Sequence, residues 1–509
     1  MKKLLVLLLL SSSVAYGQRG FTIDETVYGP SKFAPKTLTA AKWIKDADAF
    51  SNLDSTSQNL LTREAKNNWT PVQLASTNDI LNALKEIAAN DKFSLRSFPS
   101  NYSWIDKENI KLNIRAEKNS YNISYNVYSK KAKLNATLPN NRDAEEFSHS
   151  NKHTAYLNGN NIEIIKADGS KITVTKDTVD GIVNGSSVVH RNEFGISKGM
   201  WWSPDDKKLL YYRKDESMVS KYPLPQWDTR VATIKDIRYP MAGMKSEEVT
   251  LNIFNTETGE YVQLQTGEPK EQYLTIVTWD PSSDFVFVGV LNRGQDHLKL
   301  NKFNAKNGEL VQTLFEESSS TWVEPQVALE FIPNKPDQFL YQTDKDGFNQ
   351  LYLYNTQGKL VKNLGYKDVI VTDFQGFDAK GNKGYYIGAS NQGMERHLFE
   401  VDLKSGKTSQ LTSNKGTHNA SVSSSGKYIL DQYSNLDQPN IVQVIDKKSN
   451  KAQNLVTAAN PFNGKVDLPK IEFKTLTSAD GKTPLNARIT YPANFDPNKK
   501  YPVMVYLYG

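Results

Sequence analysis

The sequence of 509 residues contains no cysteine. Disulfide bonds, thiolate metal sites, a cysteine nucleophile and a lipid-modified cysteine near the amino terminus are therefore excluded. Its 62 basic and 56 acidic residues give a net charge of only +6, and no lysine- or arginine-rich run concentrates that charge. Nucleic-acid-binding surfaces usually show such a run, so we expect no nucleic-acid partner.

Long apolar stretches are missing too. Beyond the amino terminus, nothing approaches the roughly 20 apolar residues of a membrane-spanning helix. The amino terminus has the pattern of an export signal: two lysines precede an apolar run at residues 4–10, and small residues flank Tyr16 at a cleavage site. An uncleaved anchor is the alternative, but the run is too short to span a bilayer. We predict a signal peptide at 1–17 and a protein exported to a periplasm or to the extracellular space.

What the sequence has in abundance is a repeat. Its unit is an aromatic or apolar residue, a short polar turn such as S-P-D, an apolar strand, a loop and a second alternating strand. Most copies lie about 45 to 55 residues apart, which is the spacing of propeller blades. The copies begin at Phe147, Trp202, Trp279, Phe331, Phe377 and Val422.

This repeat predicts a mostly β fold, a seven- or eight-bladed β-propeller at residues 51–465. One small sheet cannot bury both of its faces, but neighbours around a ring can. Strands near residues 110–128 would supply the additional blades. A stack of unrelated β-sandwiches is the alternative, and the common period disfavours it.

Other segments flank or interrupt the repeat. Residues 18–50 form a polar N-terminal leader, and helical spacing of apolar residues predicts a helix at 76–88. Residues 216–247 lengthen one repeat and contain several prolines, which predicts a projecting arm.

The repeat ends near Pro461, and strands are predicted at 471–477, 486–491 and 502–508. The last of these, P-V-M-V-Y-L-Y, is continuously apolar, as in a strand that is covered on both faces in a parallel sheet. We therefore expect residues 466–509 to be the start of an α/β domain that the chain does not complete.

Two local motifs could carry chemistry. Residues 195–199 match G-x-S-x-G, but a nucleophile elbow joins a buried strand to a helix, and here a blade strand follows, so we interpret Ser197 as a chance match. His149 and His153 have H-x-x-x-H spacing, but they span a turn and a strand and no third ligand is evident. We therefore predict no metal site and no cofactor.

Several segments together resemble the dipeptidyl-peptidase IV branch of the prolyl oligopeptidase family of serine peptidases. The likeness runs from about residue 21 to the end. The matching segments are V-H-R-N-E-F-G-I (189–196), W-W-S-P-D (201–205), Y-R-K-D-E-S-M-V (212–219), Y-P-M-A-G (239–243), L-N-R-G-Q-D-H-L (291–298), W-V-E (322–324), D-G-F-N-Q-L-Y-L-Y (346–354) and K-Y-P-V-M-V-Y-L-Y-G (500–509).

The resemblance implies an eight-bladed propeller capping an α/β-hydrolase domain, whose Ser-Asp-His triad would lie beyond Gly509. It implies a substrate-binding role for Glu193, with Arg191 and Asn192 nearby, since a carboxylate in a partly dehydrated cavity pairs well with a peptide's ammonium group. In dipeptidyl-peptidase IV itself this position is a pair of adjacent glutamates; this sequence has one of them, which resembles prolyl tripeptidyl peptidases and related bacterial enzymes more closely. Tyr508 matches the family's oxyanion-hole tyrosine.

The resemblance therefore predicts an exported serine exopeptidase that releases N-terminal di- or tripeptides after proline, with peptides that have a free amino terminus as substrates. The arm at 216–247 matches a segment that helps to form the family's homodimer. Because the triad is absent, this chain alone is expected to be inactive. The alternative is a non-catalytic β-propeller that binds a protein or a glycan, and a triad downstream of Gly509 would distinguish the two.

Overall fold

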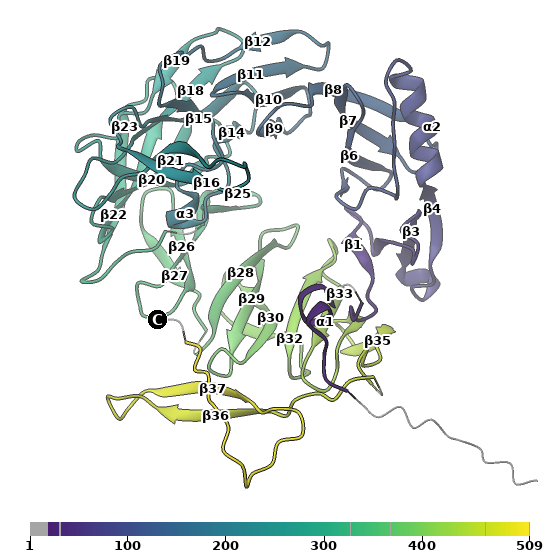
Figure 1. The fold of residues 1–509 in the computed structure, drawn as a ribbon. Helices are drawn as coiled ribbons and strands as arrows, with labels where there is room; N and C mark the ends of the chain where they lie inside the picture. Colours follow the sequence, from purple (N-terminus) through teal and green to yellow (C-terminus); the bar gives the residue numbers. More distant parts are fainter. Residues whose placement is uncertain (1–18, 30–31, 326, 367, 464, 508–509) are drawn as a thin grey trace, which may run out of the picture. The chain divides into compact units, whose positions relative to one another are not determined.

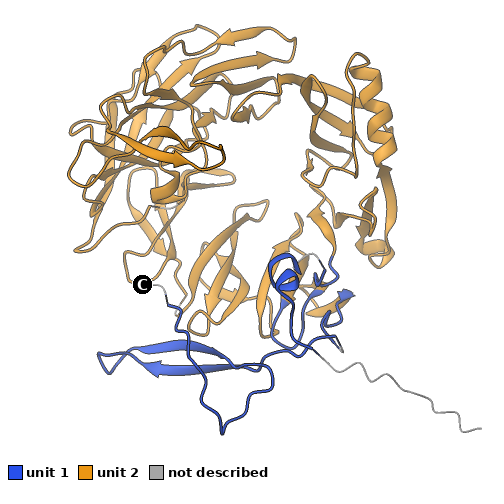
Figure 2. Cartoon of the chain, in the orientation of Figure 1, with its two compact units in different colours: residues 1–37, 434–441, 456–509 blue, residues 38–433, 442–455 orange. Residues whose placement is uncertain are grey.

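The computed structural model describes residues 19–29, 32–325, 327–366, 368–463 and 465–507. The predicted signal peptide and Tyr508 lie outside these residues. The chain divides into two compact units, shown in different colours in Figure 2: unit 1 comprises residues 1–37, 434–441 and 456–509, and unit 2 comprises residues 38–433 and 442–455. None of the described helices has the length and apolar content needed to cross a bilayer.

Unit 2 is a β-propeller. Its blades are five four-stranded sheets, one five-stranded sheet and one eight-stranded sheet that a single parallel bridge, Arg396 to Thr417, joins from two halves of four strands. The described residues thus form eight blades, within the predicted seven or eight, and Figure 1 shows them following one another around a ring.

The first four blades contain β1 (Thr39–Trp43), β2 (Ala49–Leu53), β3 (Asn59–Glu64), β4 (Val72–Ser76); β5 (Ser103–Trp104), β6 (Asn109–Arg115), β7 (Asn119–Asn126), β8 (Ala132–Pro139); β9 (Glu145–Phe147), β10 (His153–Asn158), β11 (Asn161–Lys166), β12 (Lys171–Thr173); β13 (Ile182–Asn184), β14 (Met200–Trp202), β15 (Lys208–Asp215), β18 (Glu248–Asn255) and β19 (Tyr261–Gln263). The last four contain β20 (Gln272–Trp279), β21 (Phe285–Asn292), β22 (His297–Asn304), β23 (Leu310–Ser318); β24 (Glu330–Ile332), β25 (Lys335–Thr343), β26 (Gln350–Asn355), β27 (Leu360–Asn363); β28 (Ile370–Phe377), β29 (Lys383–Ser390), β30 (Glu395–Asp402), β31 (Thr408–Gln410); β32 (Thr417–Val422), β33 (Tyr428–Ser434), β34 (Ile441–Asp446) and β35 (Lys451–Thr457).

The aromatic residue of the repeat ends a strand, and the polar turn after it reverses the chain. Trp202 ends β14 and Trp279 ends β20. In the turn after Trp202, the Ser203 hydroxyl donates to the Asp205 carboxylate over 2.6 Å, and Asp206 takes the left-handed conformation, with φ 59°. Aspartate tolerates that conformation better than most residues, so Asp206, directly after S-P-D, suits the end of the turn.

The core lies in the seams between blades. A separate cluster of buried apolar side chains fills each seam between consecutive blades, as between blades 3 and 4, where Leu157 and Ile164 meet Trp202 and Phe254. The same holds for the other consecutive pairs. Each sheet thus buries both faces against its neighbours, as the repeat predicted.

The seam between the first and the last blade is made differently. No strand of one blade pairs with a strand of the other among the described residues. Side chains join them: the Trp43 indole donates to the Ser421 hydroxyl over 3.0 Å, the Lys427 ammonium lies 3.2 Å from the Asp48 carboxylate, and the Trp69 ring packs edge-on against Tyr428 at 5.1 Å.

Two additions interrupt the blades, one where a helix was expected and one where an arm was. The helix α2 (Thr77–Ile87) has Ser76 as its N-cap in a capping box with Asp79, and it packs against β8. The predicted arm contains the antiparallel strands β16 (Lys221–Gln226) and β17 (Thr233–Arg238), which pair only with each other among the described strands.

Unit 1 combines the chain's two ends. The short helix α1 (Ile23–Tyr28) precedes Phe33, which packs with Phe21 against Phe462, and Arg19 forms a parallel bridge with Val466. The antiparallel strands β36 (Ile471–Thr477) and β37 (Pro484–Thr490) follow.

Unit 2 also contains a short 3-10 helix, η2 (Ala65–Asn67).

The structure differs from the sequence predictions at two boundaries. Blade 1 begins with β1 at Thr39, within the segment predicted to be a leader. Residues 502–507 form no strand, and Val503, Met504 and Tyr506 are 85%, 94% and 92% exposed. A strand of this kind forms only against neighbours that accept its hydrogen bonds and cover its faces, and the described chain gives this run neither.

Candidate functional site

The residues predicted to bind substrate share one short helical turn. The helix α3 (Arg191–Phe194) lies between β13 and β14, with His190 and Gly195 in the left-handed conformation at its two ends. The Phe194 amide donates to the His190 carbonyl over 3.0 Å, and the Gly195 amide donates to the Arg191 carbonyl over 2.9 Å. These bonds close a single turn that stops at Gly195.

The turn presents its polar side chains to solvent and buries its apolar one. Arg191, Asn192 and Glu193 are exposed, whereas Phe194 is buried and packs edge-on against Tyr273 at 5.2 Å. The structure therefore brings together all three residues predicted from the sequence.

The two charged side chains of the turn differ in whether they have a partner. The Arg191 guanidinium donates to the Ser187 hydroxyl over 2.9 Å. The Glu193 carboxylate has no ion pair or hydrogen-bond partner among the described residues. A carboxylate fixed on a packed turn and left without a cation can accept hydrogen bonds from an incoming ammonium group.

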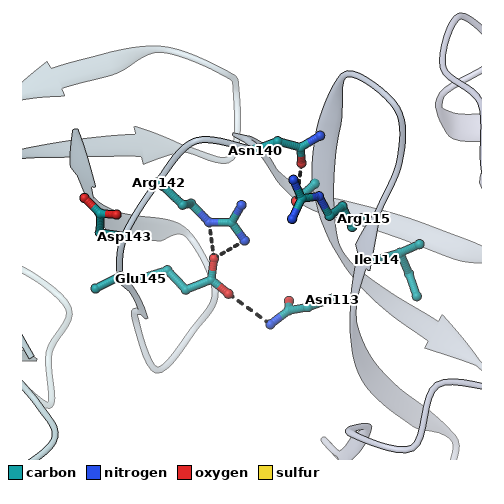
Figure 3. A pocket seen from close by; sticks show the side chains of 9 residues that line it. Asn113, Ile114, Arg115, Asn140, Arg142, Asp143 and Glu145 are labelled. Carbon is teal, nitrogen blue, oxygen red and sulfur yellow. Dashed lines mark hydrogen bonds and ion pairs between the residues drawn. The ribbon is translucent and has the colours of Figure 1, made fainter. Parts of the chain in front are cut away.

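A second feature was not predicted from the sequence: a pocket of about 330 Å³ between blades 2 and 3, drawn in Figure 3. Within it the Arg142 guanidinium forms an ion pair with Glu145, whose other oxygen accepts a 3.3 Å bond from the Asn113 amide. Arg115 is exposed in the same pocket and forms no ion pair with any described residue. Its guanidinium can donate to carbonyl or carboxylate oxygens of a ligand. Glu193 does not line this pocket.

A weak sequence signal for the pocket exists. Residues 109–115 alternate, so that Ile110, Leu112 and Ile114 are buried while Asn113 and Arg115 face outwards on the same side of β6. Arg142, by contrast, comes from the loop before the next blade, and no local pattern links it to β6.

The rejected motifs have structural roles. Ser197 is exposed in the segment that leads into β14, and a strand rather than a helix follows it. The His149 Nδ1 atom lies 3.1 Å from the Asp206 carboxylate, and the His153 ring stacks on Trp202 at 5.6 Å. Burial lowers the pKa of His153. In the part of the chain that the structure describes, no three histidine or acidic side chains are grouped as metal ligands would be.

Comparison with known proteins agrees with this fold. The model of the dipeptidyl peptidase IV (DPP IV) N-terminal region matches residues 106–440. A solved Bacteroides ovatus protein assigned as a dipeptidyl aminopeptidase IV is 32% identical, with a TM-score of 0.84 over 96% of this chain and 70% of that one. Dipeptidyl peptidase 4 of Porphyromonas gingivalis, at 23% identity and a TM-score of 0.77, supports the fold alone.

Curated relatives are more distant in sequence. The probable dipeptidyl-aminopeptidase B of Pyrenophora tritici-repentis is 26% identical over 411 residues, which cover 73% of this chain and 46% of the relative. Dipeptidyl peptidase 4 of Trichophyton rubrum is 25% identical over 382 residues, covering 72% and 49%. The fold and these matches together define a class of protein: the propeller-containing N-terminal regions of peptidases.

The chain belongs to the dipeptidyl peptidase IV family, which confirms the resemblance found in the sequence. It spans about half the length of the curated relatives it matches.

Proposed function

We propose that this chain is the substrate-recognising propeller of an exported serine exopeptidase that releases N-terminal di- or tripeptides after proline. Family membership supports the peptidase class. The observation that carries the recognition role is the Glu193 carboxylate, which is exposed on a packed turn and has no cation partner among the described residues. Such a group favours peptides with a free amino terminus, because an acylated terminus carries no charge to pair with it.

The catalytic part of the proposal lies outside the described residues. Tyr508 would donate to the tetrahedral intermediate, and the Ser-Asp-His triad would follow Gly509. Without those residues, the propeller would bind peptides but would not cleave them. Sequencing the reading frame past Gly509 tests this: a G-x-S-x-G with Asp and His behind it supports the peptidase, and a stop codon directly after Gly509 favours the rival non-catalytic binding module.

The recognition role is tested with Glu193→Gln in the protein expressed from the complete reading frame. Isothermal titration with Ala-Pro and Ala-Ala-Pro peptides, free and N-acetylated, measures the preference for a free amino terminus. Losing one charge-assisted bond of about 1.5–3 kcal/mol reduces that preference roughly 10- to 150-fold. Glu86→Gln, an exposed glutamate on α2, is the matched control. An equal preference for the free over the N-acetylated peptides in Glu193→Gln and in Glu86→Gln would contradict the proposal.

We also propose that the arm forms a homodimer contact. The arm exposes apolar side chains, with Trp227, Val231 and Ile234 at 81%, 78% and 69%. Exposed apolar groups at this density are typical of association surfaces. Sedimentation of Trp227→Lys is expected to show monomer where the wild type is dimeric, while Trp322→Lys, an equally large exposed residue outside the arm, leaves the dimer intact. A wild type that sediments as a monomer would overturn the proposal.

Export is the remaining part of the proposal. Amino-terminal sequencing of the mature protein from the periplasmic and extracellular fractions is expected to begin at Gln18. A mature protein that begins at Met1 contradicts it.

A further inference from the structure

The turn that carries Glu193 is too short to hold its own conformation. A helix of four residues is far below the length at which isolated helices are stable. His190, directly before it, has φ 56°, a left-handed conformation that is strained for a residue with a side chain. Something outside the turn must therefore fix it, and the contacts of His190 show what does.

The His190 side chain is 3% exposed and is enclosed by three aromatic rings. Phe194, Tyr212 and Tyr273 meet the imidazole edge-on, at centroid distances of 6.2, 5.7 and 5.4 Å. Tyr212 belongs to β15 of the same blade, and Tyr273 belongs to β20 of the next blade. The ring thus packs between the turn and two blades.

A hydrogen bond also fixes the orientation of the imidazole ring. The Leu274 amide of β20 donates to His190 Nε2 over 3.4 Å, so Nε2 carries the lone pair and Nδ1 carries the proton. Nδ1 is buried without a partner among the described residues, and His190 borders a cavity of about 10 Å³, the size of one water. Polar residues complete its lining: Ser246, Glu247, Glu271, Gln272, Tyr273 and Arg293.

We propose that His190 is a positioning residue for recognition of the substrate's amino terminus. By tying the turn α3 to β20 through its ring and its Nε2 atom, it holds the Glu193 carboxylate in a fixed place. This role rests on the proposed function of Glu193. It differs from simple core filling, because a phenylalanine would fill the same space while offering neither the acceptor nor the donor.

The experiment compares His190→Phe, which keeps the ring, with His190→Gln, whose amide oxygen can accept near the position of Nε2. Tyr212→Phe is the matched control: the Tyr212 hydroxyl donates to the carbonyl of the same Leu274, yet makes no bond to the turn. Two quantities are measured on the complete protein. One is the preference for Ala-Ala-Pro over its N-acetyl form, and the other is hydrogen exchange at the amides of Phe194 and Gly195.

We expect His190→Phe to lower the preference about tenfold and to speed exchange at both amides, because a small displacement of a binding group is costly. His190→Gln should recover part of both, and Tyr212→Phe should change neither. The proposal would be overturned if His190→Phe showed the same exchange rates and the same preference as the wild type, provided that Glu193→Gln abolishes the preference. If Glu193→Gln leaves the preference intact, the proposed function is wrong and the recognition role of His190 falls with it, whatever the exchange rates show about the turn.

Discussion

The imidazole of His190 is expected to be one of the groups through which acid weakens the fold. Burial lowers its pKa to about 4, because an imidazolium in this aromatic enclosure loses its hydration. Glu247 opposes this shift and Lys214 adds to it, and Glu271 and Arg293 also border the adjoining cavity. In the unfolded chain the pKa returns to about 6.5.

The sign follows from these two pKa values. Above pH 6.5, His190 is neutral in both states and its contribution to stability is complete. As the pH falls from 6.5 towards 4, the unfolded chain binds a proton that the folded chain does not, so stability is lost. The loss reaches about 2 kcal/mol at pH 5 and about 3 kcal/mol in total, at about 1.4 kcal/mol for each pH unit.

Urea unfolding of the wild type and of His190→Gln at pH 7, 6 and 5, followed by tryptophan fluorescence, measures this effect. Other groups titrate in both proteins, so only the difference between the two free energies of unfolding is read. That difference should shrink by about 2 kcal/mol between pH 7 and pH 5, because glutamine does not titrate. A difference that stays constant across this range would refute the reasoning and show that the ring is hydrated in the folded protein.

Two further predictions concern buried contacts and backbone geometry. Asp431 and His418 are both fully buried, with His418 Nδ1 2.9 Å from the Asp431 carboxylate, so Asp431→Ala should cost about 3–5 kcal/mol in urea unfolding by leaving that buried nitrogen without its partner; a loss below about 1 kcal/mol would contradict a buried pair. Gly308 and Gly259 both have φ 75°, but a Cβ at Gly308 would lie 2.1 Å from the Gln263 carbonyl oxygen, whereas Gly259 faces open space. Gly259→Ala should therefore cost only about 1–2 kcal/mol, and Gly308→Ala clearly more; equal thermal unfolding midpoints would show that the backbone yields at Gly308.

The repeat could be predicted because its signals are local. Aromatic strand ends, polar turns and alternating strands recur in each copy, and hairpin glycines such as Gly308, Gly358 and Gly406 have the positive φ that their positions require. Blade 1 was missed because its turn reads K-D-A-D rather than S-P-D. Asp46, with φ 57°, supplies the left-handed residue there, two positions after Ile44.

Features that depend on distant partners could not be predicted in the same way. The turn with Glu193 came from a resemblance, and the sequence showed neither its length nor the enclosure of His190, since that enclosure is built by Tyr212 and Tyr273 from two different blades. The pocket with Arg115 is assembled from two blades. The apolar run at 502–507 shows the limit most clearly, because composition gives a preference for strand while the ladder partner decides whether one forms.

The seam between the first and the last blade has a mechanical consequence. Every other seam is crossed by the continuous chain, whereas no strand pairing crosses this one among the described residues, and side-chain contacts such as Trp43 with Ser421 and Asp48 with Lys427 join its two sides. Tension that pulls the first and the last blade apart would therefore break a few side-chain hydrogen bonds and ring contacts before it breaks any strand pairing. The propeller would open at this seam first, while each blade stays folded.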